Sequence, residues 1–594
     1  MKSFWKTVLA VIVGSIFTAI IGWTIMMFFI SIISAIGSAA GSSSVPSNGI
    51  LKIDMAKIVL SEQSTNADPT SALSMVRGEE VATPVGLLES IKAIEKAAED
   101  PGVKYIFLLP DGAQGGMAGF EEFRKAIVKF RESGKPVIAF TENPGNASYY
   151  LASAADKIYM SSYAGGMNTL VGLSSQMFFL KDILDKLGVN VQLIRHGKYK
   201  SAGEMYIKND ISPENRLQYE TLIGSIWSSW SKTMAESRGI TAEEFNGMID
   251  NLELNSPEDF LSHGLVDSLY TRQQLEDQLC ALYGTSKISN VKEIAFSDYV
   301  ATNSVTTSKS KKKIAIIYAD GEIVDGKAKQ EVAGDRFASL IAKVRKDSTI
   351  KAVVFRVNSP GGSVVASDKI KTEIDLMREC KPVIASYGDY AASGGYWISN
   401  SCDKIFCDES TLTGSIGVFS MIPDLSNTVK DLAHVKVVNI NSNKHGDMYS
   451  LMKPLDSNEL EYMQASVEDI YDRFTSIVAE GRDMDKEFVD SIAQGRVWAG
   501  NDALEIGLVD QIGTLQDAIL YAAEVIDSGD DYATISYPKP QTTWEMIIES
   551  ISGTSEETIF SGTPFEGIAN AFKDIEVTQA GKAYARLPYG ITIK

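Results

Sequence analysis

The sequence predicts an α/β protein in which one domain occurs twice behind a single N-terminal transmembrane helix. Three observations support this: short β-branched runs alternate with amphipathic stretches, the same series of segments recurs at a steady offset, and residues 8–36 carry no charged side chain. Alternating strands and helices are typical of parallel sheets with right-handed crossovers.

The N-terminal segment is predicted to be a retained membrane anchor. About 20 apolar residues span a bilayer, whereas the apolar part of a cleaved signal peptide has only about 7–15 residues, so residues 8–36 favour a span. Lys2 and Lys6 precede it, and the positive-inside rule then places residues 1–7 in the cytoplasm. We therefore expect a single-pass protein of the inner (cytoplasmic) membrane, with its domains on the periplasmic or extracytoplasmic side.

An internal repeat follows the anchor. Residues 103–108 match 350–355, residues 134–139 match 380–385, and residues 264–267 match 507–510, at offsets of 243 to 247 residues. A steady offset indicates tandem duplication of one domain. The expected organisation is given by these boundaries: linker 37–49, N-terminal domain 50–300, linker 301–313, C-terminal domain 314–528 and C-terminal extension 529–594.

The elements of each copy are predicted from the spacing of apolar residues. Residues 352–357 form an apolar run with one arginine, which is typical of a strand buried on both faces. Ile370, Ile374 and Met377 recur at helical spacing, which predicts a helix over residues 367–379.

Composition limits the classes of function. The protein has 44% hydrophobic residues and a net charge of −20, which is typical of a globular chain and disfavours a nucleic-acid binder. Its four Cys are too few for a disulfide framework, and Cys402 and Cys407 are spaced wrongly for a CxxC pair. No cofactor and no metal are expected.

Three small-residue motifs in the C-terminal copy are candidates for chemistry. They occupy residues 358–363 (NSPGGS), 389–397 (DYAASGGYW) and 412–418 (LTGSIGV). Consecutive glycines let backbone N–H groups point into a site, and Ser393 stands on an open strand-to-helix turn. The first copy has Asn146 where the second has Ser393, so it retains the scaffold without this hydroxyl.

A serine nucleophile needs a base to accept its proton, and the residue types leave two candidates for this base. Only four His occur, and His445 is the one near a glycine turn that remains a candidate. A lysine is the other option, because burial can bring its pKa towards neutrality. Lys200, in the segment Gly197-Lys198-Tyr199-Lys200-Ser201-Ala202, is that candidate.

The motifs around Ser393 (YAASGGY), Ser415 (TGSIG) and Lys200 (YKSA) resemble those of the long-form signal peptide peptidase A (protease IV) family. That family comprises membrane-anchored Ser-Lys proteases of the ClpP/crotonase-like superfamily, and the likeness covers nearly the whole chain. It implies a ClpP/crotonase-like fold for both domains, an inactive first copy and a homotetramer. It also implies peptide substrates, namely signal-peptide remnants left by signal peptidase.

The resemblance also implies roles for individual residues. Ser393 would be the nucleophile, Lys200 the general base supplied by the first domain, and Ser415 the group that orients Lys200. Gly361, Gly362 and Gly394 would border the oxyanion hole. Two alternatives remain at this stage: a crotonase-like acyl-CoA enzyme, and a non-catalytic membrane-tethered scaffold.

Overall fold

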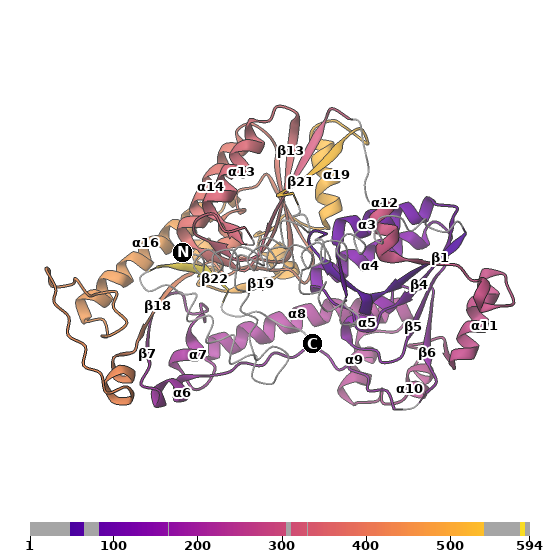
Figure 1. The fold of residues 1–594 in the computed structure, drawn as a ribbon, viewed down its shortest axis with the longest axis horizontal. Coiled ribbons are helices and arrows are strands. Elements are labelled where there is room, and N and C mark those ends of the chain that lie inside the picture. The colour runs from indigo at the N-terminus through magenta and orange to yellow at the C-terminus, as the bar shows by residue number, and fades with distance from the viewer. Residues whose placement is uncertain are drawn as a thin grey trace, which may run out of the picture.

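The computed structural model describes residues 48–64, 82–163, 165–303, 310–329, 331–539 and 582–587. The expected cytoplasmic segment 1–7 and anchor 8–36 lie outside these residues. Within the described ranges, no helix combines the length and apolar character needed to cross a membrane. The predicted mixed α/β architecture with two tandem domains is confirmed (Figure 1).

The N-terminal domain is built on a parallel six-stranded sheet in the order β8-β6-β5-β4-β1-β9. Helices cover both faces, since one core packs under α3, α4, α5 and α12 and another under α11. The strands are β1 (Gly49–Asp54), β4 (Val103–Leu109), β5 (Val137–Thr141), β6 (Lys157–Ser161), β8 (Ser268–Tyr270) and β9 (Glu293–Ala295). The helices are α3 (Leu87–Glu99), α4 (Met117–Arg131), α5 (Asn146–Ala152), α9 (Ala242–Asp250), α10 (Pro257–Ser262), α11 (Arg272–Tyr283) and α12 (Phe296–Asn303). β2 (Ile58–Ser61) and β3 (Thr83–Gly86) form a separate two-stranded sheet.

The C-terminal domain repeats this plan. Its sheet contains six parallel strands in the order β20-β16-β15-β13-β10-β21. β17 also pairs with β15, and β19 pairs antiparallel with β17. The strands are β10 (Lys313–Asp320), β13 (Ile350–Ser359), β15 (Val383–Ala392), β16 (Lys404–Cys407), β17 (Leu412–Gly414), β19 (Val497–Ala499), β20 (Gln511–Ile512) and β21 (Ala533–Tyr537). The helices are α13 (Gly334–Lys346), α14 (Val364–Arg378), α15 (Gly394–Trp397), α16 (Ser457–Arg482), α17 (Lys486–Ile492), α18 (Gly500–Glu505) and α19 (Leu515–Val525). One face of this sheet carries an apolar cluster, and among these helices only α19 contributes residues to that cluster.

Corresponding hydrogen bonds hold the two domains in the same shape. Tyr149 donates to the Leu265 carbonyl, and Tyr396 donates to the Leu508 carbonyl, at 2.8 Å in both cases. β9 and β21 occupy the same place, each pairing with the first strand of its sheet. The C-terminal sheet therefore extends past the expected boundary at residue 528, because its outer strand comes from the segment assigned to the extension.

A third sheet combines residues from both halves of the chain, in the order β12-β11-β14-β22-β18-β7. Its strands are β7 (Asn190–His196), β11 (Ile323–Val324), β12 (Val332–Ala333), β14 (Gly361–Ser363), β18 (Val418–Asp424) and β22 (Tyr584–Arg586). β7 pairs antiparallel with β18, from Asn190 opposite Asp424 to His196 opposite Val418. The first half thus supplies an edge strand to the second.

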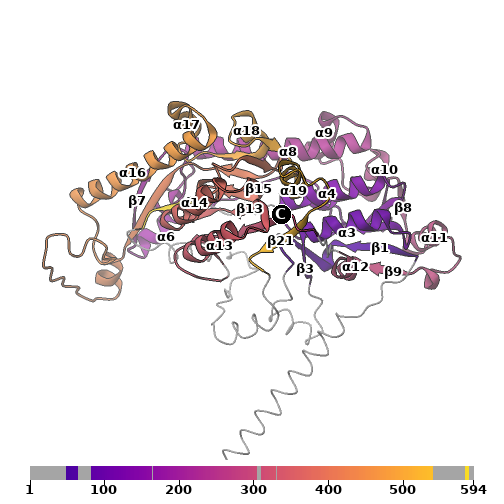
Figure 2. The ribbon, with the colours of Figure 1, turned by 90° about the horizontal axis from the view of Figure 1, so that it is seen from above.

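The segment that carries β7 reaches across to the C-terminal domain. Figures 1 and 2 show β7 and α6 (Lys181–Lys186) beside the second half, and α8 running back to the first domain. α8 (Pro213–Arg238) begins where the Ser212 side chain accepts from the Asn215 amide, with proline at the first helical position. α7 (Glu204–Ile207) lies between β7 and α8.

A buried arginine joins the two domains. Arg356, the one charged residue of the predicted apolar run in β13, is 1% exposed. Its guanidinium contacts both carboxylate oxygens of Glu62 at 2.7 and 3.0 Å and one oxygen of Glu122 at 2.8 Å. Both acids belong to the first domain, so one guanidinium pairs with two acidic side chains at the domain interface.

Replacing this arginine should destabilise the protein strongly. We expect Arg356→Met to lower the free energy of unfolding by about 3–5 kcal/mol, because it leaves two buried carboxylates unpaired. Arg473→Met is the matched control, since Arg473 pairs with Asp368 at the surface and such pairs contribute at most about 1 kcal/mol. Urea unfolding of both variants measures the difference, and equal effects would contradict the role given to Arg356.

Candidate active site

Ser393 lies on a sharp turn between β15 and α15. Its backbone angles are φ 56° and ψ −113°, a conformation that costs a non-glycine residue about 1–3 kcal/mol. The Ser393 amide donates to the Gly414 carbonyl at 2.8 Å, which fixes the turn against the end of β17. The side chain is fully buried.

Lys200 comes from the other half of the chain and meets this serine. It follows β7, so the β7–β18 pairing carries it into the C-terminal domain. Its Nζ lies 2.9 Å from Ser393 Oγ, 3.0 Å from Ser415 Oγ and 3.2 Å from the Ser415 carbonyl oxygen. All three residues are 0% exposed. The structure therefore brings together the three side chains singled out from the motifs.

The electrostatics of this cluster centre on the lysine. Burial lowers the pKa of Lys200 well below its ordinary value, because the charged amine loses its hydration. A lysine of lowered pKa is a better proton acceptor near neutral pH than a solvated one. The arrangement can therefore move a proton between Ser393 Oγ and Lys200 Nζ.

Gly495 makes room for Lys200, and the sequence analysis missed it. A Cβ on Gly495 would lie 2.5 Å from the Lys200 Cβ, and its φ of +79° is a conformation that favours glycine. Its amide donates to the Ile416 carbonyl at 2.8 Å, and the neighbouring Gln494 carbonyl accepts from Tyr199 at 2.9 Å. The available signal was an isolated glycine two residues before a short strand, since a glycine at a strand often marks a close backbone approach.

The predicted glycines line one side of the serine. Gly361 has φ +100°, and a Cβ there would lie 2.6 Å from the Gly394 amide nitrogen. A Cβ on Gly362 would lie 1.9 Å from the Ile323 carbonyl oxygen. The backbones of β14 and of the first residue of α15 therefore approach each other in a way that side chains would prevent.

The first domain uses the corresponding position differently. The Asn146 amide oxygen accepts from the Val171 and Gly172 amides, and its nitrogen donates to the Gly172 carbonyl at 2.8 Å. This side chain holds a loop in place. The first copy thus has a structural group where the second has a buried hydroxyl.

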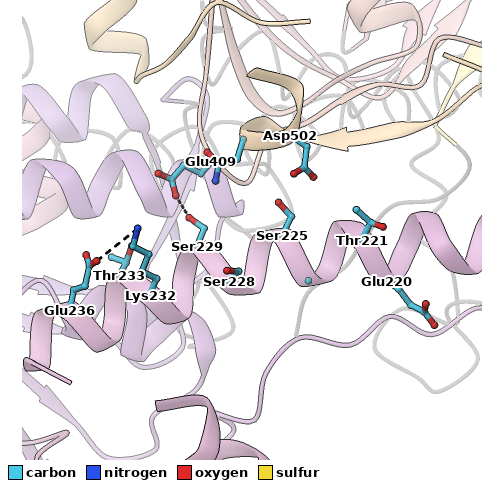
Figure 3. Close-up of a pocket in the computed structure, with 12 residues that line it drawn as sticks. Glu220, Thr221, Ser225, Ser228, Ser229, Lys232, Thr233, Glu236, Glu409 and Asp502 are labelled. Carbon is cyan, nitrogen blue, oxygen red and sulfur yellow. Dashed lines mark hydrogen bonds and ion pairs between the residues drawn. The ribbon is translucent and has the colours of Figure 1, made fainter. Parts of the chain in front are cut away.

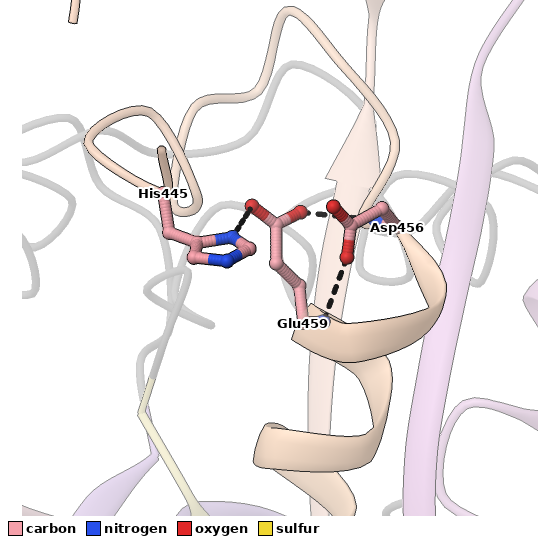
Figure 4. Close-up of side chains that lie close together, drawn as sticks. All are labelled: His445, Asp456 and Glu459. Carbon is pink, nitrogen blue, oxygen red and sulfur yellow. Dashed lines mark hydrogen bonds and ion pairs between the residues drawn. The ribbon is translucent and has the colours of Figure 1, made fainter. Parts of the chain in front are cut away.

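His445, the alternative base, lies in another environment. Its Nδ1 is 2.9 Å from Glu459 Oε1, and Asp456 lies beside them at the start of α16 (Figure 4). Lys453 also contacts both oxygens of Glu459, at 2.9 and 3.0 Å. Asp456 and Glu459 form the capping box of this helix, so the cluster stabilises a helix end.

A polar pocket of about 670 Å³ lies along α8 (Figure 3). Most of its lining comes from α8, with Glu409, Asn501 and Asp502 contributed by the C-terminal domain. Ser229 of the helix contacts Glu409 across it. Neither Ser393 nor Lys200 is among its lining residues, so this pocket is separate from the serine–lysine cluster.

Comparison with known proteins identifies the family. The family model described as "Peptidase family S49" matches residues 129–285 and 375–527, one segment in each domain. The chain belongs to peptidase family S49.

Relatives in this family match the chain over most of its length. "Protease 4" of Haemophilus influenzae is 34% identical over 522 residues, covering 86% of this chain and 84% of the relative. "Protease 4" of Salmonella typhi is 35% identical over 532 residues (87% and 85%), and the chloroplastic "Serine protease SPPA" of Arabidopsis thaliana is 30% identical over 469 residues (77% and 69%). The predicted resemblance to the protease IV family is confirmed, and the chain is a serine protease of family S49. Among solved structures, a point mutant of ClpP1 from Listeria monocytogenes is 18% identical and covers 34% of this chain and 94% of its own, with a TM-score of 0.24.

Gly495 gives a test of how tightly this S49 site is packed. We expect Gly495→Ala to lower peptidase activity at least tenfold, because the new Cβ displaces Lys200 and misplacement by about 1 Å can cost 100-fold in rate. Gly239→Ala is the control: Gly239 has a similar φ of +69° but nothing within 4 Å of the added Cβ. Turnover of a fluorogenic peptide by both variants is the measurement, and equal losses would show that backbone strain alone is responsible.

Proposed function

We propose that this protein is a membrane-anchored serine endopeptidase with a Ser393–Lys200 dyad, which degrades cleaved signal peptides and other apolar peptides. One observation carries the proposal: Lys200 Nζ lies 2.9 Å from Ser393 Oγ, and both side chains are fully buried. Membership of family S49 favours this chemistry over the acyl-CoA enzyme and the non-catalytic scaffold.

The proposed reaction uses the neutral form of the lysine. Lys200 Nζ accepts the Ser393 proton as Oγ attacks the peptide carbonyl carbon. The same amine then protonates the leaving nitrogen, and the peptide bond breaks to leave an ester on Ser393. Water, deprotonated by Lys200, hydrolyses this ester and regenerates the serine.

Two further groups complete the proposed site. Ser415 holds Lys200 through its hydroxyl and carbonyl oxygens, which keeps Nζ directed at Ser393. The amides of Gly362 and Gly394, next to Gly361, are the proposed donors to the oxyanion. Loss of one such donor typically costs about 10²–10³-fold in rate.

The proposed setting is a membrane surface. Residues 8–36 anchor the chain in the inner (cytoplasmic) membrane, and both domains lie on the periplasmic or extracytoplasmic side. The proposed assembly is a homotetramer. This location would bring the site close to signal peptides that remain in the bilayer after secretion.

Removal of either member of the dyad should abolish activity. We expect Ser393→Ala and Lys200→Ala to lower kcat for a signal-peptide-like substrate by about 10³-fold or more, as in other nucleophile–base pairs. Lys198→Ala, at the exposed neighbouring lysine, should change kcat by less than about twofold. Steady-state kinetics on the purified full-length chain measures these effects, and near-normal turnover by either dyad variant would refute the assignment.

The pH dependence follows from the lowered pKa of Lys200. Protonated Lys200 cannot accept the serine proton, so kcat/KM should rise with pH through this pKa and fall as pH drops below it. Because burial shifts the pKa downward from 10.5, the plateau should begin below the pH at which a solvated lysine titrates. A profile that stays flat down to pH 5 would be inconsistent with a lysine base.

A further inference from the structure

A two-residue turn, Gln494–Gly495, packs against the backbone of the segment that carries Lys200. The Tyr199 amide donates to the Gln494 carbonyl at 2.9 Å, and a Cβ added to Gly495 would lie 2.6 Å from the Lys200 backbone nitrogen. A Cβ added to Gly197 would lie 2.4 Å from the Gln494 carbonyl carbon. The turn therefore contacts both ends of the lysine segment, and its position determines where the lysine backbone lies.

Gln494 has an unfavourable backbone conformation in this turn. Its φ is +54°, in the left-handed region that residues other than glycine seldom adopt. A residue in such a conformation persists only where the surrounding structure holds it there. The side chains that bind Gln494 are therefore expected to control the shape of the turn.

Those side chains are Tyr471 of α16 and Asp490 of α17. The Gln494 amide donates to the Tyr471 hydroxyl oxygen at 3.3 Å. Gln494 Nε2 lies 3.2 Å from the same oxygen and 2.7 Å from Asp490 Oδ1. The Tyr471 hydroxyl donates to Asp490 Oδ1 at 2.5 Å. Burial, together with Asp490, raises the pKa of Tyr471 above its ordinary value, so the phenol stays protonated and keeps this hydrogen bond.

Tyr471 also packs against the strand that leads to Lys200. Its ring stacks on the ring of His196, the last residue of β7, with 3.7 Å between the centroids and 21° between the planes. Figure 2 shows α16 lying along β7. Tyr471 is 5% exposed. This one side chain thus contacts both the strand before Lys200 and the turn beside it.

We propose that Tyr471 is a positioning residue of the peptidase reaction, which acts through the Gln494–Gly495 turn to keep Lys200 Nζ at Ser393 Oγ. This inference rests on the proposed function of Ser393 and Lys200. Without the Tyr471 hydroxyl, the strained Gln494 backbone relaxes, and the backbone of Lys200 moves with it.

Movement of the turn should change the reaction in two ways. Displacement of Nζ from Oγ slows proton transfer, because misplacement of a reacting group by about 1 Å can cost about 100-fold in rate. A looser turn also admits water to the amine, which favours its charged form and brings the pKa of Lys200 back up toward its ordinary value. The rise of kcat/KM with pH should then occur at higher pH. A tyrosine that served stability alone would not move it.

Tyr471→Phe tests this proposal, because it removes the hydroxyl and keeps the ring that stacks on His196. We expect kcat for a fluorogenic peptide to fall about tenfold, with KM within about twofold of the wild type. We also expect the midpoint of the rise of kcat/KM with pH to move upward by about 0.5 pH unit or more.

Tyr149→Phe is the matched control. Tyr149 is also buried, and its hydroxyl donates to the Leu265 carbonyl in the first domain. This variant loses one buried hydroxyl away from the dyad, so kcat should stay within about twofold of the wild type and the pH midpoint should not move.

A second substitution tests the route through the turn. Glycine adopts the left-handed conformation without strain, so Gln494→Gly should keep the shape of the turn when the hydroxyl is absent. We expect the double variant Tyr471→Phe/Gln494→Gly to have a kcat at least about threefold above that of Tyr471→Phe. Its pH midpoint should return toward that of the wild type. Failure of the glycine to raise kcat would overturn the role given to the turn.

The remaining outcomes separate this proposal from the proposed function. If Tyr471→Phe has normal kcat and an unshifted pH profile while Ser393→Ala and Lys200→Ala are inactive, the positioning role is wrong and the dyad stands. Equal losses of kcat in Tyr471→Phe and Tyr149→Phe, with no shift in the pH midpoint, would also overturn it. If Lys200→Ala turns over the peptide normally, the proposed function itself fails.

Discussion

The antiparallel pairing of β7 with β18 connects the two halves of the chain and takes Lys200 out of water. Without that pairing the lysine would belong to an ordinary basic loop, with a hydrated amine and an ordinary pKa. With it, Nζ lies between two serine hydroxyls and loses its hydration. The charge of one side chain thus depends on a strand contact between two domains, and the proposed chemistry depends on that charge.

Duplication explains how such an arrangement can exist. Each copy needs its parallel sheet and helices to be stable, but only one copy needs a reactive turn. In the first copy Asn146 holds a loop in place. The long segment of this copy that contains β7 and α8 contacts the second domain. Arg356, Glu62 and Glu122 hold the domains together elsewhere, which limits how far they can separate.

The sheets were predictable from the sequence, because buried parallel strands appear as continuous apolar runs and the repeat identified each run twice. Ser393 and the glycines of 358–363 were recognisable from local motifs. Lys200 could be chosen over His445 only through the resemblance, since its burial is created by residues far along the chain. The same reason explains why Gly495, β21 and β22 were not predicted. The position of a short strand is set by the strand that it pairs with, and its own residues carry little sequence signal. The boundary at residue 528 therefore fell before the last strand of the C-terminal sheet.

The separation of Lys200 and Ser393 along the sequence also determines when the site forms during synthesis. Lys200 and Ser393 are 193 residues apart, and β18, the strand that places the lysine, is synthesised after both. Domains generally fold from the N-terminus during synthesis, and contacts between distant residues form late. A growing chain therefore carries a solvated amine and an unassisted hydroxyl until the second domain closes over them. Under the proposed mechanism, a nascent chain has no proteolytic activity until its second domain has folded.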